Sequence, residues 1–104
     1  MGEENQIWIC LAHVTANQDT ESVLESGKKA YVNVLGYAIN PLDFEIQIKN
    51  ALDEMGLILL SIEDEEPFSV RISEWEVNDM ILEKAKEVEQ TKNIRFTTFH
   101  AYSE

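Results

Sequence analysis

The chain has 104 residues, of which 20 are acidic and 8 basic, so its formal net charge is −12. This length predicts a single domain, residues 1–104, and the charge argues against binding to nucleic acid or to an anionic membrane surface, because both need clustered Lys and Arg. A lone cysteine, Cys10, excludes an internal disulfide, and we expect the protein to work in the reducing cytoplasm.

Two strands are predicted in the first part of the chain. Residues 7–16 carry apolar side chains on both faces of the expected strand, which indicates an interior strand or one covered on both sides. A polar connection follows over residues 17–27, where Thr20 has the chemistry to cap one helical turn. Residues 29–39 form the second expected strand. One of its faces carries only small side chains and is therefore assigned to the helices: Ala30, Val32, Val34, Gly36 and Ala38.

A helix is predicted to begin at Asn40 and Pro41. Asn accepts hydrogen bonds from free backbone N–H groups, and Pro loses nothing at the first helical position. Gly56 is expected to end the helix, because it tolerates the left-handed conformation. The apolar residues between them recur at helical spacing: Phe44, Ile48, Ala51, Leu52 and Met55.

The next segment predicts a hairpin. Residues 57–62 are expected to form a short buried strand, and residues 63–67 a turn, because like charges and Pro67 oppose pairing with a neighbouring strand. Phe68, Val70 and Ile72 alternate with polar residues and predict the return strand.

A second helix and a last strand complete the expected elements. Ser73 and Asn78 are rival caps for a helix that ends near Lys92, and residues 94–102 alternate as a strand. The helix is expected to bury Val77, Ile81, Leu82, Ala85 and Val88.

From Lys29 onward the predicted order is β-α-β-β-α-β. We therefore predict an α+β fold, a ferredoxin-like two-layer sandwich with both helices on one face of an antiparallel sheet. The strand at residues 7–16 would be an addition, paired with the second strand or placed at an edge. The open sheet face would then carry Tyr31, Leu35 and Tyr37, together with Phe96 or Phe99. Because a monomer rarely leaves so much apolar area in water, a homodimer or a bound partner is expected to cover this face.

No catalytic signature is visible in the sequence. It lacks a phosphate-binding loop, a dinucleotide fingerprint, a nucleophile elbow and zinc-ligand spacing, so we expect a protein that is not an enzyme and has no cofactor. His13 and His100 lie on the first and last expected strands and could converge on a metal ion or a proton, although two structural histidines are the simpler interpretation. Cys10 and His13 are three positions apart and so face opposite sides of a strand, which argues against a nucleophile pair. Cys10 is expected to be an inert buried thiol.

The acidic run at residues 63–66 is the most distinctive local feature. It lacks the glycine and the alternating ligands of a calcium loop, and it is interpreted either as a solvated turn that guards a hairpin tip or as a surface for a basic partner. Trp75 lies between two acids where the second helix begins and is expected to be partly exposed, as in a protein-binding hot spot. The predicted partner surface comprises Glu63, Asp64, Glu65, Glu66, Glu74, Trp75 and Glu76.

These features favour a non-catalytic acidic interaction protein that neutralises a basic protein, as immunity and antitoxin proteins do. The alternative is a small-molecule-binding or regulatory domain that dimerises through the sheet contacts Tyr31, Leu35 and Tyr37. A small enzyme or metal protein that uses His13 and His100 is the third hypothesis.

Overall fold

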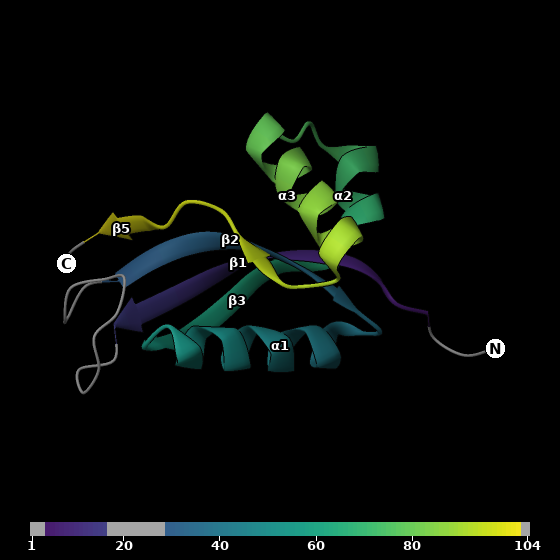
Figure 1. The fold of residues 1–104 in the computed structure, drawn as a ribbon. Helices are drawn as coiled ribbons and strands as arrows, with labels where there is room; N and C mark the ends of the chain where they lie inside the picture. Colours follow the sequence, from purple (N-terminus) through teal and green to yellow (C-terminus); the bar gives the residue numbers. More distant parts are fainter. Residues whose placement is uncertain (1–3, 17–28, 103–104) are drawn as a thin grey trace.

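The fold is an antiparallel sheet with three helices, and the computed structural model describes residues 4–16 and 29–102 (Figure 1). The strands are β1 (Gln6–Ala16), β2 (Lys29–Ala38), β3 (Leu57–Pro67), β4 (Arg95–Phe96) and β5 (His100–Tyr102), and the helices are α1 (Pro41–Glu54), α2 (Phe68–Glu74) and α3 (Asp79–Thr91). This arrangement confirms the predicted α+β class. The connection predicted at residues 17–27 lies outside the described residues.

The sheet order is β3-β1-β2-β4, and β5 also pairs with β2. The strand predicted as an addition, β1, is therefore a central strand, antiparallel to β2 on one side and to β3 on the other. Its apolar residues explain this position, because both faces are buried: Ile9 and Cys10 have no exposed surface. A strand with two apolar faces is stable only where both faces are covered.

Helix α1 follows the sequence prediction closely. The Asp43 N–H donates to Oδ1 of Asn40 at 2.8 Å, so Asn40 caps the helix as expected. Phe44, Ile48 and Leu52 are buried against the small-residue face of β2. A Cβ at Gly36 would lie 2.9 Å from Cε1 of Phe44, so the absence of a side chain there allows the helix to approach the sheet.

The helices are divided between the two faces of the sheet, whereas the prediction placed them on one. Helix α1 covers one face, and α2 and α3 lie over the other (Figure 1). The second face has its own buried cluster, formed by Ile9, Leu35, Phe68, Ile81, Ala85 and Val88. The ferredoxin-like order is not found, because α2 follows β3 where the prediction placed a return strand, and α3 follows α2 directly.

The return strand predicted at Phe68, Val70 and Ile72 is wrong, since this segment forms α2. Strand β3 continues through the acidic residues to Pro67, which is paired with Trp8 of β1, and the helix begins immediately after it. Phe68 is buried, while Val70 and Ile72 are exposed. The alternation is therefore no guide here, because in a helix the alternating residues do not all share one buried face.

Asn78 rather than Ser73 caps α3. The Ile81 N–H donates to Oδ1 of Asn78 at 2.9 Å, and the Ser73 hydroxyl instead donates to the Val70 carbonyl within α2. Ile81, Ala85 and Val88 face inward as predicted. The prediction for Leu82 was wrong, because this side chain is exposed.

The last predicted strand is interrupted. It splits into β4 and β5, which pair with different parts of β2, and between them the Thr97 N–H donates to the Asn33 carbonyl. Phe96 and Phe99 pack against the cluster on the α1 side. The described residues contain no helix that is long and apolar enough to cross a bilayer.

Candidate functional site

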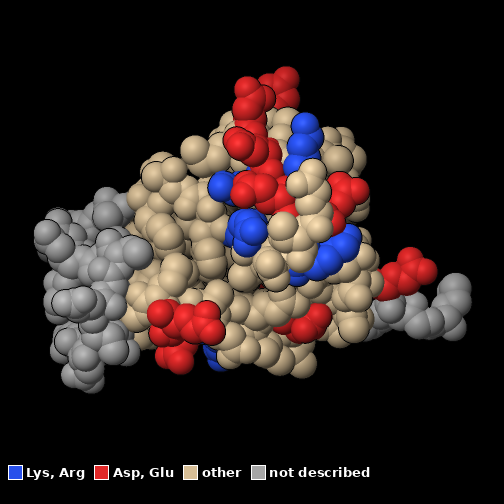
Figure 2. All heavy atoms as spheres, in the orientation of Figure 1, with Lys and Arg blue, Asp and Glu red and all other residues tan. Residues whose placement is uncertain are grey.

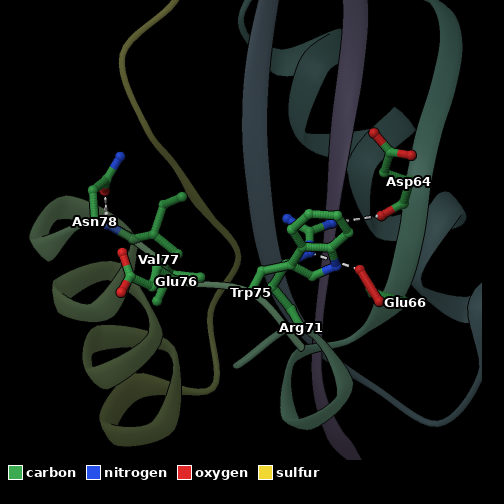
Figure 3. A pocket seen from close by; sticks show the side chains of 8 residues that line it. Asp64, Glu66, Arg71, Trp75, Glu76, Val77 and Asn78 are labelled. Atoms are coloured by element: carbon green, nitrogen blue, oxygen red, sulfur yellow. Dashed lines mark hydrogen bonds and ion pairs between the residues drawn. The ribbon is translucent and has the colours of Figure 1, made fainter. Parts of the chain in front are cut away.

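A hollow of about 570 Å³ lies between the edge strand β3, the end of α2 and the start of α3. In Figure 3 the residues of β3 lie on one side, those of the link before α3 lie on the other, and Trp75 and Arg71 lie between them. Four of the seven residues predicted for the partner surface line this hollow, although they are up to twelve positions apart in the chain: Asp64, Glu66, Trp75 and Glu76. The remaining lining residues are Arg71, Val77, Asn78 and Ile81.

The acidic run belongs to an edge strand, so the turn predicted there is wrong. Glu63 is paired with Leu11 and Glu66 with Ile9, so β3 has one more residue in this interval than β1. Asp64 has a φ of 54°, as expected for a bulge that accommodates the extra residue. Pairing with β1 therefore outweighs the repulsion among the carboxylates, and it presents Glu63 and Glu66 on the side of the sheet that carries α2 and α3.

Arg71 is the functional-site residue that sequence reasoning missed. Its Nε donates to Oε2 of Glu66 at 2.6 Å, and its Nη2 donates to the Asp64 carbonyl at 2.9 Å. One guanidinium thus ties α2 to the bulge of β3. A signal was present, because Arg71 is the only basic residue between Lys49 and Lys84 in an acidic chain.

Trp75 is 65% exposed, which confirms the predicted partial exposure. Helix α2 ends at Glu74, and Trp75 takes up an extended conformation with its N–H donating to the Arg71 carbonyl at 2.9 Å. In the link that follows, Val77 packs against the cluster under α3, while Glu76 is exposed. Half-buried Val77 therefore anchors the link, and the Trp75 ring and the Glu76 carboxylate lie at the mouth of the hollow.

The other three predicted partner residues do not line the hollow. Glu63 on β3 and Glu74 at the end of α2 are exposed. Glu65 belongs to the opposite side of the strand, where burial raises its pKa, and repulsion and a side-chain hydrogen bond with Glu45 of α1 act in the same direction. Oε2 of Glu65 is buried without a hydrogen-bond partner among the described residues. Glu65 is thus half-buried between α1 and β3, away from the hollow.

Acidic side chains lie at several places on the face drawn in Figure 2. One group is at the top of the view, over the link between α2 and α3, and others are along the lower edge and at the right, with most of the Lys and Arg between them. The hollow itself contains three carboxylates and one guanidinium. The site consequently has a surplus of negative charge although Arg71 is part of it.

The structure gives little support to a nucleophilic cysteine or to a metal site among the described residues. Cys10 is fully buried, and burial first, then the negative charges of Glu65 and Glu45, raise the pKa of its thiol to about 12. A thiol in this state is not a nucleophile near neutral pH. The described residues include no group of three or more His, Cys, Asp or Glu side chains that could hold a metal ion.

His13 and His100 lie in one row across the sheet, with Tyr31 between them. His13 is paired with Tyr31 in the first ladder, and Tyr31 is paired with His100 in another. The His13 and Tyr31 rings are stacked with 4.4 Å between their centroids. Two strand spacings separate the histidine backbones by about 10 Å, so the row does not bring the imidazoles together on one ion.

The predicted dimer contacts are only partly accessible. Leu35 is fully buried in the cluster that includes residues of α2 and α3, so it cannot touch a second copy while those helices remain in place. Tyr37 is half-buried, with Nζ of Lys92 lying 4.2 Å from its ring centroid. Tyr31 is the one of the three that does not pack against that cluster, and one face of its ring is stacked on the His13 ring.

Comparisons with protein-family models, with curated proteins and with solved structures found no match for this chain.

Proposed function

We propose that the chain is a non-catalytic, cytoplasmic interaction protein that neutralises a basic protein partner, as immunity and antitoxin proteins do. The observation that carries the proposal is the convergence of Asp64, Glu66 and Glu76 with the exposed ring of Trp75 around one hollow. Charge alone would be weak support in so acidic a chain. A large exposed aromatic residue in a concave site is typical of a protein-binding hot spot, and the carboxylates around it complement basic side chains of a partner.

The charge of the whole molecule favours a cationic protein as the partner. A net charge of −12 on 104 residues repels nucleic acid and anionic membranes and attracts basic surfaces over a distance of about 10 Å at moderate ionic strength. Complementary charge accelerates encounter, and the buried aromatic contact then slows dissociation. The two contributions predict an affinity that falls with added salt without vanishing.

The dimer hypothesis receives less support from the fold. It needs an uncovered apolar sheet face, and Leu35, at the centre of that predicted face, lies beneath the chain's own helices. The acidic hollow needs no such rearrangement, because Trp75 and Glu76 are exposed in the chain as folded.

The test begins with capture of partners on the immobilised protein from a cytosolic extract of its source, followed by purification of each bound protein. Binding of the purified partner is then measured between about 50 and 500 mM salt, and any enzymatic or toxic activity of the partner is assayed with and without the chain. We expect a basic partner, an affinity that falls at least tenfold over this range, and loss of the partner's activity in the complex.

A matched pair of charge reversals sharpens the test. Glu76→Lys alters the mouth of the hollow, whereas Glu54→Lys changes the same charge at an exposed position at the end of α1. The proposal requires E76K to weaken binding much more than E54K. An affinity that does not respond to salt, or equal losses from the two variants, would contradict it.

A further inference from the structure

The walls of the hollow already hold one guanidinium. Arg71 donates its Nε hydrogen to a carboxylate oxygen of Glu66 and its Nη2 hydrogen to the carbonyl of Asp64, at 2.6 and 2.9 Å. A carboxylate and a carbonyl set side by side by the bulge of β3 are acceptors that suit the planar fork of arginine. The chain therefore shows, with its own side chain, which cation this edge of the hollow accommodates.

Arg71 does not use all the acceptors. It contacts the backbone of Asp64 and leaves the Asp64 carboxylate free, and the described residues provide no ion pair to the Glu76 carboxylate on the opposite wall. Three carboxylates against one guanidinium leave the hollow with two surplus negative charges. The two exposed carboxylates, those of Asp64 and Glu76, are therefore available to a second cation.

The indole of Trp75 adds a surface that distinguishes between cations. It is 65% exposed and lies between the two acidic walls in Figure 3. A guanidinium stacks on an indole face while its N–H groups still donate, within its own plane, to carboxylates at its edge, whereas an ammonium is compact and more strongly hydrated. Val77 and Ile81 supply an apolar lining for the methylene stem of such a side chain.

We propose that the hollow is an arginine pocket, in which Trp75 stacks on a guanidinium of the basic partner and the carboxylates of Asp64 and Glu76 accept its hydrogen bonds. The proposal rests on the proposed function and specifies its chemistry. An arginine of the partner anchors the complex, and a lysine at the same position is a poor substitute. The occupant is a side chain of the basic protein partner proposed above, and the acidic lining of the hollow repels anionic ligands.

Two defined probes test the pocket without the natural partner. Hexa-arginine and hexa-lysine peptides carry equal charge, and each is titrated into the intact chain at about 100 mM salt. Binding is followed by the indole Nε1–H resonance of Trp75 in nitrogen–proton correlation spectra. A Trp75→Phe variant assigns this resonance, since the other indole, that of Trp8, is buried and donates to the Ala38 carbonyl.

We expect hexa-arginine to bind about two- to fivefold more tightly than hexa-lysine, the ratio that an exposed stacking contact of this kind supplies. Trp75→Ala should remove this preference. The matched control is Leu42→Ala on α1, on the opposite side of the sheet, because Leu42 is 67% exposed and its loss removes a similarly exposed apolar side chain. Circular dichroism verifies that both variants are folded.

A second pair of variants tests the carboxylates. Glu76→Gln should weaken binding of hexa-arginine by a larger factor than Glu54→Gln, which removes the same charge at the end of α1. The arginine-pocket proposal is wrong if the wild type binds the two peptides with equal affinity. It is also wrong if the Trp75 resonance shifts no more than the resonances of exposed residues on α1.

The failure of this inference differs from a failure of the proposed function. If the purified partner binds with strong salt dependence and Trp75→Ala changes its affinity no more than Leu42→Ala does, the partner is recognised by charge and the arginine pocket is wrong. If the partner's affinity does not depend on salt, the proposed function itself is wrong.

Discussion

The two faces of the sheet are covered in different ways. On one face the 14-residue helix α1 lies across small side chains of β2 and forms a continuous buried cluster that extends from Trp8 to Leu57. On the other face the cover is divided between α2, with seven residues, and α3, with 13, and the buried cluster beneath them is half the size. We therefore expect truncations beneath α1 to cost more stability than truncations beneath α2 and α3.

The less complete cover leaves room for the hollow. Between the end of α2 and the start of α3 the chain is extended, and Trp75 and Glu76 lie on the surface there rather than in a core. The comparison shows that the candidate binding surface lies where the helical cover of the sheet is interrupted, at the extended link between α2 and α3.

The largest expected effect separates the two faces directly. Phe44→Ala removes a fully buried ring beneath α1 and should lower the free energy of unfolding by about 3–5 kcal/mol. Phe68→Ala, at the margin of the other cluster, should cost clearly less, because Phe68 is already slightly exposed and its site can collapse toward solvent. Urea denaturation of both variants measures the difference, and equal losses would contradict the unequal roles of the faces.

A smaller loss is expected where α1 approaches the sheet most closely. Gly36→Ala places a Cβ 2.9 Å from Cε1 of Phe44, and overpacking of this kind should cost about 1–3 kcal/mol. Combining it with Phe44→Leu, which removes the ring that the new methyl meets, should cost less than the sum of the two single changes. If the losses in free energy of unfolding are strictly additive in a double-mutant cycle, the contact between position 36 and Phe44 does not limit how closely α1 approaches the sheet.

The helix caps are expected to have similar effects on stability and different effects on binding. Asn78→Ala and Asn40→Ala each remove a side-chain acceptor from a helix start and should each cost about 1 kcal/mol. Asn78 also lines the hollow, so N78A should weaken hexa-arginine binding, whereas N40A should not. Denaturation and the same peptide titration provide both readouts, and equal binding by the two variants would argue that α3 is not needed to shape the site.

The smallest effect concerns Glu65, and it depends on pH. Burial and the neighbouring Glu45 raise the pKa of Glu65, so the native state holds this proton more tightly than the unfolded state does. Its contribution to stability is therefore complete at acid pH and is lost as the pH rises through the raised pKa. Glu65→Gln should consequently stabilise the protein by a few tenths of a kcal/mol near neutral pH and have no effect below about pH 4.

The exposed Glu54→Gln variant is the control for this change, since it removes one carboxylate from the same helix that carries Glu45. Its stability relative to wild type should show no comparable step in thermal unfolding followed from about pH 4 to 7. A destabilised E65Q at neutral pH would mean that the ionised Glu65 has a partner that favours its charge.

Much of the local structure could be predicted from short-range signals. Asn40 and Pro41 mark the start of α1 because capping depends only on neighbouring backbone groups. The interpretation of Phe68, Val70 and Ile72 as a strand was wrong because strand formation, unlike helix capping, depends on residues that are distant in the sequence. Alternation reports which side chains could share a face, and whether the segment pairs as a strand depends on a partner that is distant in the sequence.

The sequence was sufficient to select several residues of the candidate site, but it did not predict that they surround a hollow. The acidic run and Trp75 could be selected from the sequence because charge and aromatic character are properties of the residues themselves. Their meeting around one hollow depends on the pairing of β3 with β1 and on the return of the chain through α2. Arg71 was overlooked because its role arises only when α2 places it against the bulge at Asp64.

By itself, the sequence determined the α+β class, the capped helix α1 with its small-residue counterpart on β2, the acidic character and the exposed aromatic anchor. These depend on propensity, periodicity and charge, which act within a few residues of each position. Only the tertiary structure decided that β1 is central, that the helices divide between two faces, and that Arg71 lies among the carboxylates of the hollow. Those features depend on contacts between segments that are distant in the sequence. Local preferences allow several arrangements of these segments, and the need to bury both faces of β1 selects one of them.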